Sequence, residues 1–357
     1  MKGFTTLCED LAIGDLSSSH YRASFHSFQM WCQRAALPAP GPGAQLQISL
    51  IDYLDAVLDD GGSRSTAEYA VAAVRSTFPI YSGKAGLPMP RVDRALRGFR
   101  RVTPARSRFP MPMAVTAAIA VSFMALGDWQ GGAQILLTHY CYLRPCEVRA
   151  LRNCDLLAPI PGENPGLAFW TLLIAPSERD ERTKTQTTDD TLLLDHPPWL
   201  GEVLSQFRGE KAANEFLFPN DQKHLLRQWR HVLDALGVKD ACLYQLRHGG
   251  ASDDHLAKRR PVLEIMARGR WSSTASVLRY AKAGKVQKIY NDLKKNEQLF
   301  VNWCSENLEL IVKGVIEPQL PPNLGGSLRA AKRAILTSHK KVAKVCRRPA
   351  ASASSTR

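Results

Sequence analysis

The sequence contains no apolar run long enough to cross a bilayer, which would need about 20 consecutive apolar residues. It also contains no CxxC pair, and its eight cysteines are scattered along 357 residues. Near the start, Glu9 and Asp10 stand where the apolar core of a secretory signal would be required. We therefore expect an intracellular protein with reduced thiols and no membrane partner.

Three of the cysteines, Cys141, Cys146 and Cys154, lie fairly close together, and cysteine thiolates are common ligands of zinc. Their spacing matches no common zinc site. We therefore expect buried structural thiols, and the sequence predicts no metal centre.

Acidic residues are few relative to basic ones, since 33 Asp and Glu stand against 47 Lys and Arg and give a formal net charge of +14. The excess is uneven, because residues 325–357 carry +9 of it with no acid, which leaves +5 for the rest. A second basic segment, residues 91–108, holds seven arginines against Asp93 alone. A polyanion is the first partner to consider, although net charge also serves solubility.

Residues 1–105 have the pattern of a helical module. Tyr21, Phe25, Phe28 and Trp31 recur at three- and four-residue steps, which is typical of the buried face of an amphipathic helix. Further helices, separated by breaks rich in glycine and proline, are expected over residues 47–62, 63–81 and 89–102.

The last of these expected helices carries Arg94, Arg97 and Arg101 at three- and four-residue steps, so these side chains share one face. Such a stripe is commonly a solvated surface. Because almost no acidic residues balance it, we favour the alternative that the three arginines bind the phosphates of a nucleic acid.

Residues 110–318 are expected to form a second, mostly helical domain after a linker rich in proline and arginine. Two apolar helices open it, and two strand-like stretches joined by a long polar turn follow at residues 167–176 and 191–195. Helices then resume, including a stretch over residues 285–315. The predicted fold class is mainly α with a small antiparallel β-sheet, and residues 319–357 form a basic tail expected to be mobile.

An arginine interrupts the apolar segment LTHYCYLRPCEVRAL, residues 137–151. Pro145 disfavours helix at Arg144 and is tolerated at a helix start, so the segment predicts a helix junction with Arg144 at the break. There the guanidinium could point into a cleft and hold an anion, with Glu147 behind it. The alternative is an ordinary ion pair between Arg144 and Glu147 at a helix end.

Two later segments carry similar residues. In YQLRHGG, Arg247 lies in a helix with apolar flanks, and Tyr244 precedes it by three residues on the same face. In GRWSSTASVLRYA, Trp271 precedes serines able to cap a helix, and Tyr280 follows nine residues later. Taken singly, Trp271 is more typical of a core residue and Tyr280 of a half-buried helical tyrosine.

Together, LRPCEVRAL, YQLRHGG and GRWSSTASVLRYA resemble, in this order, the two arginine boxes and the nucleophile segment of the tyrosine recombinases, the phage-integrase superfamily. The resemblance covers roughly residues 110–300, and the N-terminal module resembles the helical, SAM-like core-binding domain of that family. It implies a recombinase or integrase of the mobile-element type. Such an enzyme cleaves and rejoins double-stranded DNA through a 3′-phosphotyrosine intermediate, without metal, ATP or another cofactor.

The resemblance also implies roles for individual residues. Tyr280 is the nucleophile, Arg144 and Arg247 hold phosphate oxygens, and Trp271 donates its indole N–H to one of these oxygens. Lys184, in the polar turn between the two strand-like stretches, is the candidate general acid, with a solvated turn lysine as the alternative.

One position departs from the family pattern. Tyr244 stands where the family usually has His, sometimes Lys, and tyrosine is a weaker proton acceptor near neutral pH. A water molecule or the neighbouring His248 would then accept the proton of Tyr280. Tyr290, ten residues after Tyr280, is a competing nucleophile, but its apolar neighbours favour a packing role.

Other functions stay open. The chain could be a catalytically inactive DNA-binding relative of the same fold, a type IB topoisomerase, or a basic adaptor that binds RNA or an acidic partner through its tail. A recombinase joins two duplexes, so self-association into dimers or tetramers on DNA is expected. The segment SHKKVAKVCRR, residues 338–348, could be a nuclear-import signal or a DNA-binding arm. We expect the nucleus if the host is eukaryotic, and otherwise the cytoplasm or nucleoid.

Overall fold

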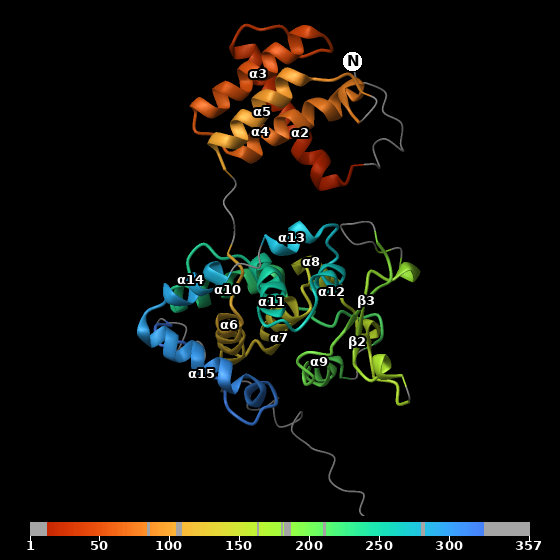
Figure 1. Cartoon of the computed structure of the whole chain (residues 1–357), viewed down its shortest axis with the longest axis vertical. Helices are drawn as coiled ribbons and strands as arrows, with labels where there is room; N and C mark the ends of the chain where they lie inside the picture. Colours follow the sequence, from red (N-terminus) through yellow and green to blue (C-terminus); the bar gives the residue numbers. More distant parts are fainter. Residues whose placement is uncertain are drawn as a thin grey trace, which may run out of the picture. The chain divides into compact units, whose positions relative to one another are not determined.

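The computed structural model describes residues 13–83, 86–104, 109–162, 164–179, 181, 187–209, 212–279 and 283–324. The chain divides into two compact units, Met1–Ser107 and Arg108–Arg357 (Figure 1). The division falls inside the segment rich in proline and arginine that we expected to be a linker. Lys184, Tyr280 and most of the basic tail lie outside the described residues.

The first unit is built from helices whose ends follow local sequence signals. They are α2 (Asp15–Arg34), α3 (Ala44–Asp59), α4 (Arg64–Thr77) and α5 (Pro90–Val102), with a 3-10 turn, η1 (Pro79–Tyr81). The hydroxyl of Ser63 accepts a hydrogen bond from the backbone N–H of Thr66 and so caps α4, while Pro90 takes the first position of α5. Phe28 from α2 and Phe99 from α5 belong to the buried core of this unit.

The second unit opens with α6 (Met113–Ala125), α7 (Trp129–Tyr140) and the short α8 (Pro145–Ala150). The strands β1 (Leu156–Leu157), β2 (Thr171–Ile174) and β3 (Asp190–Leu193) then form an antiparallel sheet in that order. Leu172 of β2 pairs with Leu156 on one side and Leu192 on the other. The sequence did not predict β1, because a two-residue strand is too short to show an alternating pattern.

The rest of the second unit is helical again. Three 3-10 turns accompany the sheet, η2 (Asn153–Asp155), η3 (Pro165–Leu167) and η4 (Ser177–Arg179). The helices that follow are α9 (Leu200–Arg208), α10 (Gln222–Leu236), α11 (Tyr244–Leu256), α12 (Val262–Arg268), α13 (Thr274–Leu278), α14 (Ala283–Asn291) and α15 (Lys295–Val312). The predicted class, mainly α with a small antiparallel sheet, is confirmed.

The helical stretch expected at residues 285–315 forms two helices, α14 and α15. The backbone at Lys294 is extended (ψ 163°), and Leu293 just before it is buried in the core. The chain therefore leaves one helix and enters the next at a point where an apolar side chain turns inward.

Two glycines let α11 closely approach the end of α7 and the chain just before α6, within the second unit (Figure 1). A Cβ atom on Gly250 would collide with the backbone carbonyl oxygen of His139, and one on Gly249 would collide with that of Met111. Only glycine permits this contact of backbone with backbone. The close approach sets the side chain of Arg247 against the turn that follows α7.

None of the helices in the described ranges is long and apolar enough to cross a membrane. Of the three clustered cysteines, Cys141 is buried, whereas Cys146 is exposed and Cys154 is half-exposed. The prediction of buried structural thiols was therefore wrong for Cys146 and Cys154, which lie in the short elements α8 and η2.

Candidate active site

Arg144 lies at the junction between α7 and α8, as Pro145 predicts. α7 ends at Tyr140, and α8 begins at Pro145 with Arg144 as its N-cap residue in an extended conformation (φ −75°, ψ 146°). Only 7% of Arg144 is exposed. Its guanidinium is therefore held inside the second unit and does not extend into solvent.

Glu147 is the carboxylate around which the arginines gather. It accepts hydrogen bonds from the backbone N–H of Arg144 at 2.6 Å and from Nη1 of the same residue at 2.5 Å. Nη2 of Arg270 donates to Glu147 at 2.5 Å, and Nη1 of Arg247 lies 3.9 Å from Oε2. One buried carboxylate thus faces three buried guanidinium groups. We call Arg144, Arg247, Arg270 and Glu147 the arginine cluster, and it has an excess of two positive charges.

Arg247 is fully buried on α11, and backbone carbonyls orient its guanidinium. Nη1 donates to the carbonyl of Tyr142, and Nη2 donates to the carbonyl of Gly269. Burial, followed by repulsion from Arg144, lowers the pKa of Arg247 to about 10. The guanidinium stays charged at neutral pH, and a bound anion would raise its pKa again.

Trp271 covers the guanidinium of Arg247. Cζ of Arg247 lies 4.7 Å from the centroid of the indole, close enough for a cation–π interaction. The ring of Tyr142 stacks on the same indole, with centroids 6.2 Å apart and an angle of 26° between the planes. Trp271 itself is half-exposed, so the site has access to solvent beside this side chain.

Gly269 is the residue that makes room for the indole. A Cβ atom at Gly269 would collide with ring carbons of Trp271. Gly269→Ala is therefore expected to displace Trp271 from Arg247, at a cost of about 1–3 kcal/mol in the free energy of unfolding. Near-ultraviolet circular dichroism measures the change in the indole environment. Gly284→Ala is the control, since a Cβ atom there meets nothing, and equal spectra for the two variants would contradict the prediction.

Tyr244, the residue that departs from the family pattern, is the first residue of α11 and is half-buried. Its ring meets that of His248, one turn later, edge to face with centroids 4.8 Å apart. The structure thus places Tyr244 and the buried His248 on the same helix as Arg247, in contact with each other.

Of the remaining predicted residues, Lys184 and Tyr280 lie outside the described residues, so their roles stay predictions. The competing tyrosine, Tyr290, has a packing role. Its hydroxyl donates a hydrogen bond to the side chain of Asn302 at 2.9 Å, and its ring packs against the core of the second unit. This hydrogen bond links α14 to α15.

Arg270 was not predicted from the sequence as a site residue. It stands directly before Trp271 inside the segment that carries the third family motif, and that position was the available signal. Its φ of 51° lies in the left-handed region, which a sequence pattern does not reveal for arginine. Tyr142 was also missed and has the same kind of backbone conformation.

The arginine cluster holds hydrogen-bond donors that lack acceptors. The Nε atoms of Arg144, Arg247 and Arg270 are buried and make no hydrogen bond with any described residue. Nε of Arg270 lies 3.8 Å from the carboxylate of Asp190, beyond hydrogen-bond distance. Buried donors without acceptors destabilise a fold, and phosphate and carboxylate oxygens are acceptors whose geometry matches a guanidinium group.

A pocket of about 260 Å³ adjoins the arginine cluster. Glu147 and Cys146 line it from α8, Ile174 lines it from β2, and Arg179 closes another side, where it pairs with Asp155 at 2.7 Å. Across the described ranges of the chain, no three His, Cys, Asp or Glu side chains gather in a way that could hold a metal ion.

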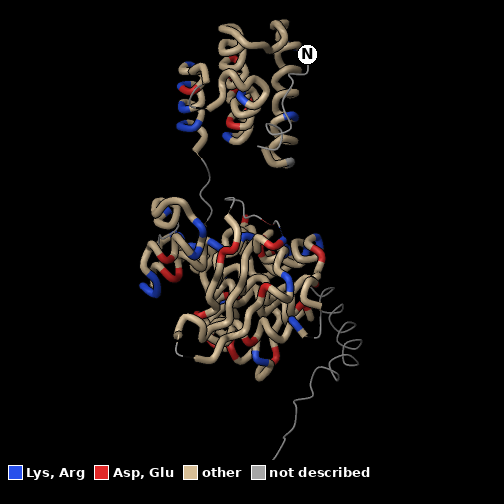
Figure 2. Tube along the Cα trace, turned by 90° about the vertical axis from the view of Figure 1, so that its right-hand side faces the viewer, with Lys and Arg blue, Asp and Glu red and all other residues tan. Residues whose placement is uncertain are grey.

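In the first unit, α5 carries the predicted arginine face. Arg94, Arg97 and Arg101 are exposed and form no ion pair with a described residue, whereas Arg100 pairs with Glu68 at 2.8 Å. The run of basic residues along this helix can be followed in Figure 2. The three exposed arginines are therefore available to a ligand.

Comparisons with known proteins give a likeness among solved structures. No family model matches the chain, and no curated protein matches it. Among solved structures, the chain is similar to a protein described as XerA recombinase, with 14% sequence identity and a TM-score of 0.35. The match covers 80% of this chain and 94% of that one.

Proposed function

We propose that the chain cleaves and rejoins double-stranded DNA as a tyrosine recombinase. The observation that carries the proposal is the arginine cluster, in which three buried guanidinium groups share one carboxylate and keep unpaired Nε donors. Two of these arginines, Arg144 and Arg247, belong to the motifs that resemble the family. An oxyanion with several oxygens is the ligand that such an excess of buried donors favours.

The chemistry fits these residue types. Attack of the Tyr280 oxygen on phosphorus forms a phosphotyrosyl ester and breaks the bond between phosphorus and the 5′ oxygen. Negative charge grows on the non-bridging oxygens in the transition state, where Arg144, Arg247 and the indole N–H of Trp271 would stabilise it. The new ester keeps the energy of the broken bond, so a 5′ hydroxyl of another DNA end can reverse the step.

Two proton transfers complete the reaction. Tyrosine has an ordinary pKa of about 10, so the Tyr280 hydroxyl must lose its proton to a base or be stabilised as a phenolate by nearby cations. The leaving 5′ oxygen must gain a proton, and we assign this step to Lys184. We assign the base to a water molecule or His248, because Tyr244 is a weak proton acceptor.

DNA binding by α5 predicts a change in salt dependence. Replacing Arg94, Arg97 and Arg101 together with Gln would remove three phosphate contacts. The negative slope of log Kobs against log salt concentration should therefore become shallower, by about 2–3 in magnitude. Fluorescence anisotropy with a labelled duplex measures both slopes. Arg64→Gln is the control, since Arg64 pairs with Glu68 at 2.9 Å. Equal slopes for the triple variant and the wild type would contradict the prediction.

A duplex with a nick near the cleavage site tests the proposed function. Cleavage releases a short fragment that diffuses away, so the covalent protein–DNA adduct accumulates and can be seen on a denaturing gel. The wild type and Tyr290→Phe should form the adduct, and Tyr280→Phe should not. An adduct that survives Tyr280→Phe would exclude Tyr280 as the nucleophile.

A catalytically inactive DNA-binding relative is the second candidate, and Tyr244 is the observation that favours it. Binding of the duplex with no adduct under any condition would support this candidate. An active recombinase also joins two duplexes, so we expect protomers to assemble as dimers or tetramers on DNA. Integration of a mobile element is a further part of the proposal. So is the location, which would be the nucleus in a eukaryotic host and the cytoplasm or nucleoid otherwise.

A further inference from the structure

Tyr142 has an unusual backbone conformation for its side chain. Its φ of 48° lies in the left-handed region, and only 1% of the residue is exposed. Bulky residues rarely adopt this conformation, which costs about 1–3 kcal/mol and persists only where the surroundings enforce it. The turn at Tyr142 joins α7 to the arginine cluster, so the conformation occurs where the chain orients Arg144.

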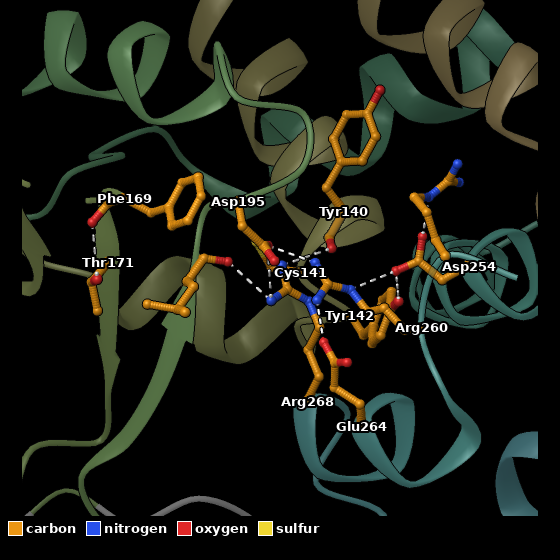
Figure 3. A network of polar contacts seen from close by, with 12 residues as sticks. Tyr140, Cys141, Tyr142, Phe169, Thr171, Asp195, Asp254, Arg260, Glu264 and Arg268 are labelled. Carbon is orange, nitrogen blue, oxygen red and sulfur yellow. Dashed lines mark hydrogen bonds and ion pairs between the residues drawn. The ribbon is translucent and has the colours of Figure 1, made fainter. Parts of the chain in front are cut away.

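Buried contacts surround the side chain of Tyr142 (Figure 3). Its hydroxyl donates a hydrogen bond to the carboxylate of Asp254, and its ring stacks on the indole of Trp271. Cζ of Arg268 lies 5.7 Å from the centroid of the same ring. The carbonyl of Tyr142 meanwhile accepts a hydrogen bond from Arg247. One residue therefore touches two members of the proposed catalytic machinery, Arg247 through its backbone and Trp271 through its ring.

Asp254 is the partner that fixes the hydroxyl. It lies seven residues after Arg247 on α11, and thus near the same face of the helix. Its carboxylate also accepts hydrogen bonds from Nε of Arg259 at 2.7 Å and from Nε of Arg260 at 3.0 Å. Burial opposes the charge, but the hydrogen bonds from Tyr142 and Arg259 prevail and hold the pKa of Asp254 below its ordinary value.

The same network reaches the last residue of β3 and the chain just after it. Nη2 of Arg260 donates to the carboxylate of Asp195 at 2.6 Å, and Nη1 of Arg268 donates to the carbonyl of Leu193 at 2.9 Å. Figure 3 shows these groups as a continuous set of polar contacts around Tyr142 and Asp254. The network therefore braces Tyr142 against both α11 and the sheet.

We propose that Tyr142 and Asp254 are positioning residues for Arg247 and Trp271. Asp254 holds the Tyr142 hydroxyl, and this contact keeps the turn in its left-handed conformation. The carbonyl of Tyr142 then meets Nη1 of Arg247, and its ring supports the indole of Trp271. The catalytic consequence of this inference rests on the proposed function, whereas the structural consequence does not.

Tyr142→Phe tests the inference, with Tyr140→Phe as the matched control. Phenylalanine keeps the ring under Trp271 but removes the hydrogen bond to Asp254. The hydroxyl of Tyr140 makes no hydrogen bond with a described residue, so its loss should matter little. We expect Tyr142→Phe to slow single-turnover cleavage of the nicked duplex by about 10- to 100-fold, because small displacements of aligned groups cost this much. DNA affinity should change less than about threefold.

A second measurement separates failure of the inference from failure of the proposed function. Hydrogen exchange of the full chain needs no catalysis, and it should become faster at residues 141–145 and 268–271 in Tyr142→Phe but not in Tyr140→Phe. If the wild type forms no adduct, the proposed function fails. The comparison of hydrogen exchange between Tyr142→Phe and Tyr140→Phe then tests the inference by itself. Unchanged exchange in Tyr142→Phe would overturn the inference. Cleavage and DNA affinity that fall by the same factor would also overturn it, because that result indicates a purely structural role.

Discussion

Arg247→Lys should lower the single-turnover rate of DNA cleavage by about 10³-fold, since loss of a preorganised guanidinium at a phosphoryl centre has effects of this size. Lysine keeps the charge but has no planar fork. It cannot donate to the carbonyls of Tyr142 and Gly269 at once and also lie under Trp271. DNA affinity should fall less than about tenfold, because Arg247 is buried and the proposal assigns further phosphate contacts to Arg94, Arg97 and Arg101.

The control for this prediction is Arg149→Lys. Arg149 is exposed on α8 and donates to the side chain of Gln222 at 2.5 Å, so it is chemically similar and outside the arginine cluster. Quenched-flow cleavage of the nicked duplex at saturating protein gives both rates. If Arg247→Lys cleaves the duplex at the rate of the wild type, the geometry of the guanidinium does not contribute to the reaction.

Glu147→Gln should destabilise the second unit by about 3–5 kcal/mol, because it removes the charge of the carboxylate that three buried guanidinium groups share. A bound anion would take the place of this charge. The free energy of unfolding of Glu147→Gln should therefore lie closer to that of the wild type in sulfate than in chloride at equal ionic strength. We call the difference between the two proteins the deficit. Urea unfolding in the two salts measures the deficit.

Sulfate stabilises many proteins, so the comparison needs a control in the same salts. Glu309→Gln serves this purpose, since Glu309 is exposed and, among the described residues, pairs with Lys313 alone, across one helical turn. The small change that Glu309→Gln makes in the free energy of unfolding should be the same in sulfate and in chloride. An equal deficit for Glu147→Gln in both salts would indicate that the cluster does not bind anions.

Local signals predicted the part of the site that depends on local geometry. Pro145 predicted the helix junction at Arg144. Glu147 follows Arg144 by three residues, a spacing that lets its carboxylate accept a hydrogen bond from the backbone N–H of Arg144. Arg247 was identified by its motif, but its orientation depends on the carbonyls of Tyr142 and Gly269, which are distant in sequence. No periodicity or spacing encodes these contacts.

The residues that sequence analysis missed share one physical cause. Tyr142 and Arg270 both have positive φ, and their side chains are held by contacts across the fold rather than by a regular helix or strand. For the fold as a whole, helices with clear apolar faces were predicted well. The two-residue strand β1 and the break at Lys294 were not, because each is set by packing that the local pattern does not contain.

The site of covalent attachment tests the central proposal most directly. After reaction with the nicked duplex, the full chain is digested with nuclease and trypsin, and mass spectrometry locates the nucleotide that stays bound. The proposed mechanism predicts a nucleotide on the peptide that begins at Tyr280, directly after Arg279. A nucleotide on Tyr244, Tyr290 or any other residue would contradict it, and so would the absence of an adduct under conditions where the chain binds the duplex.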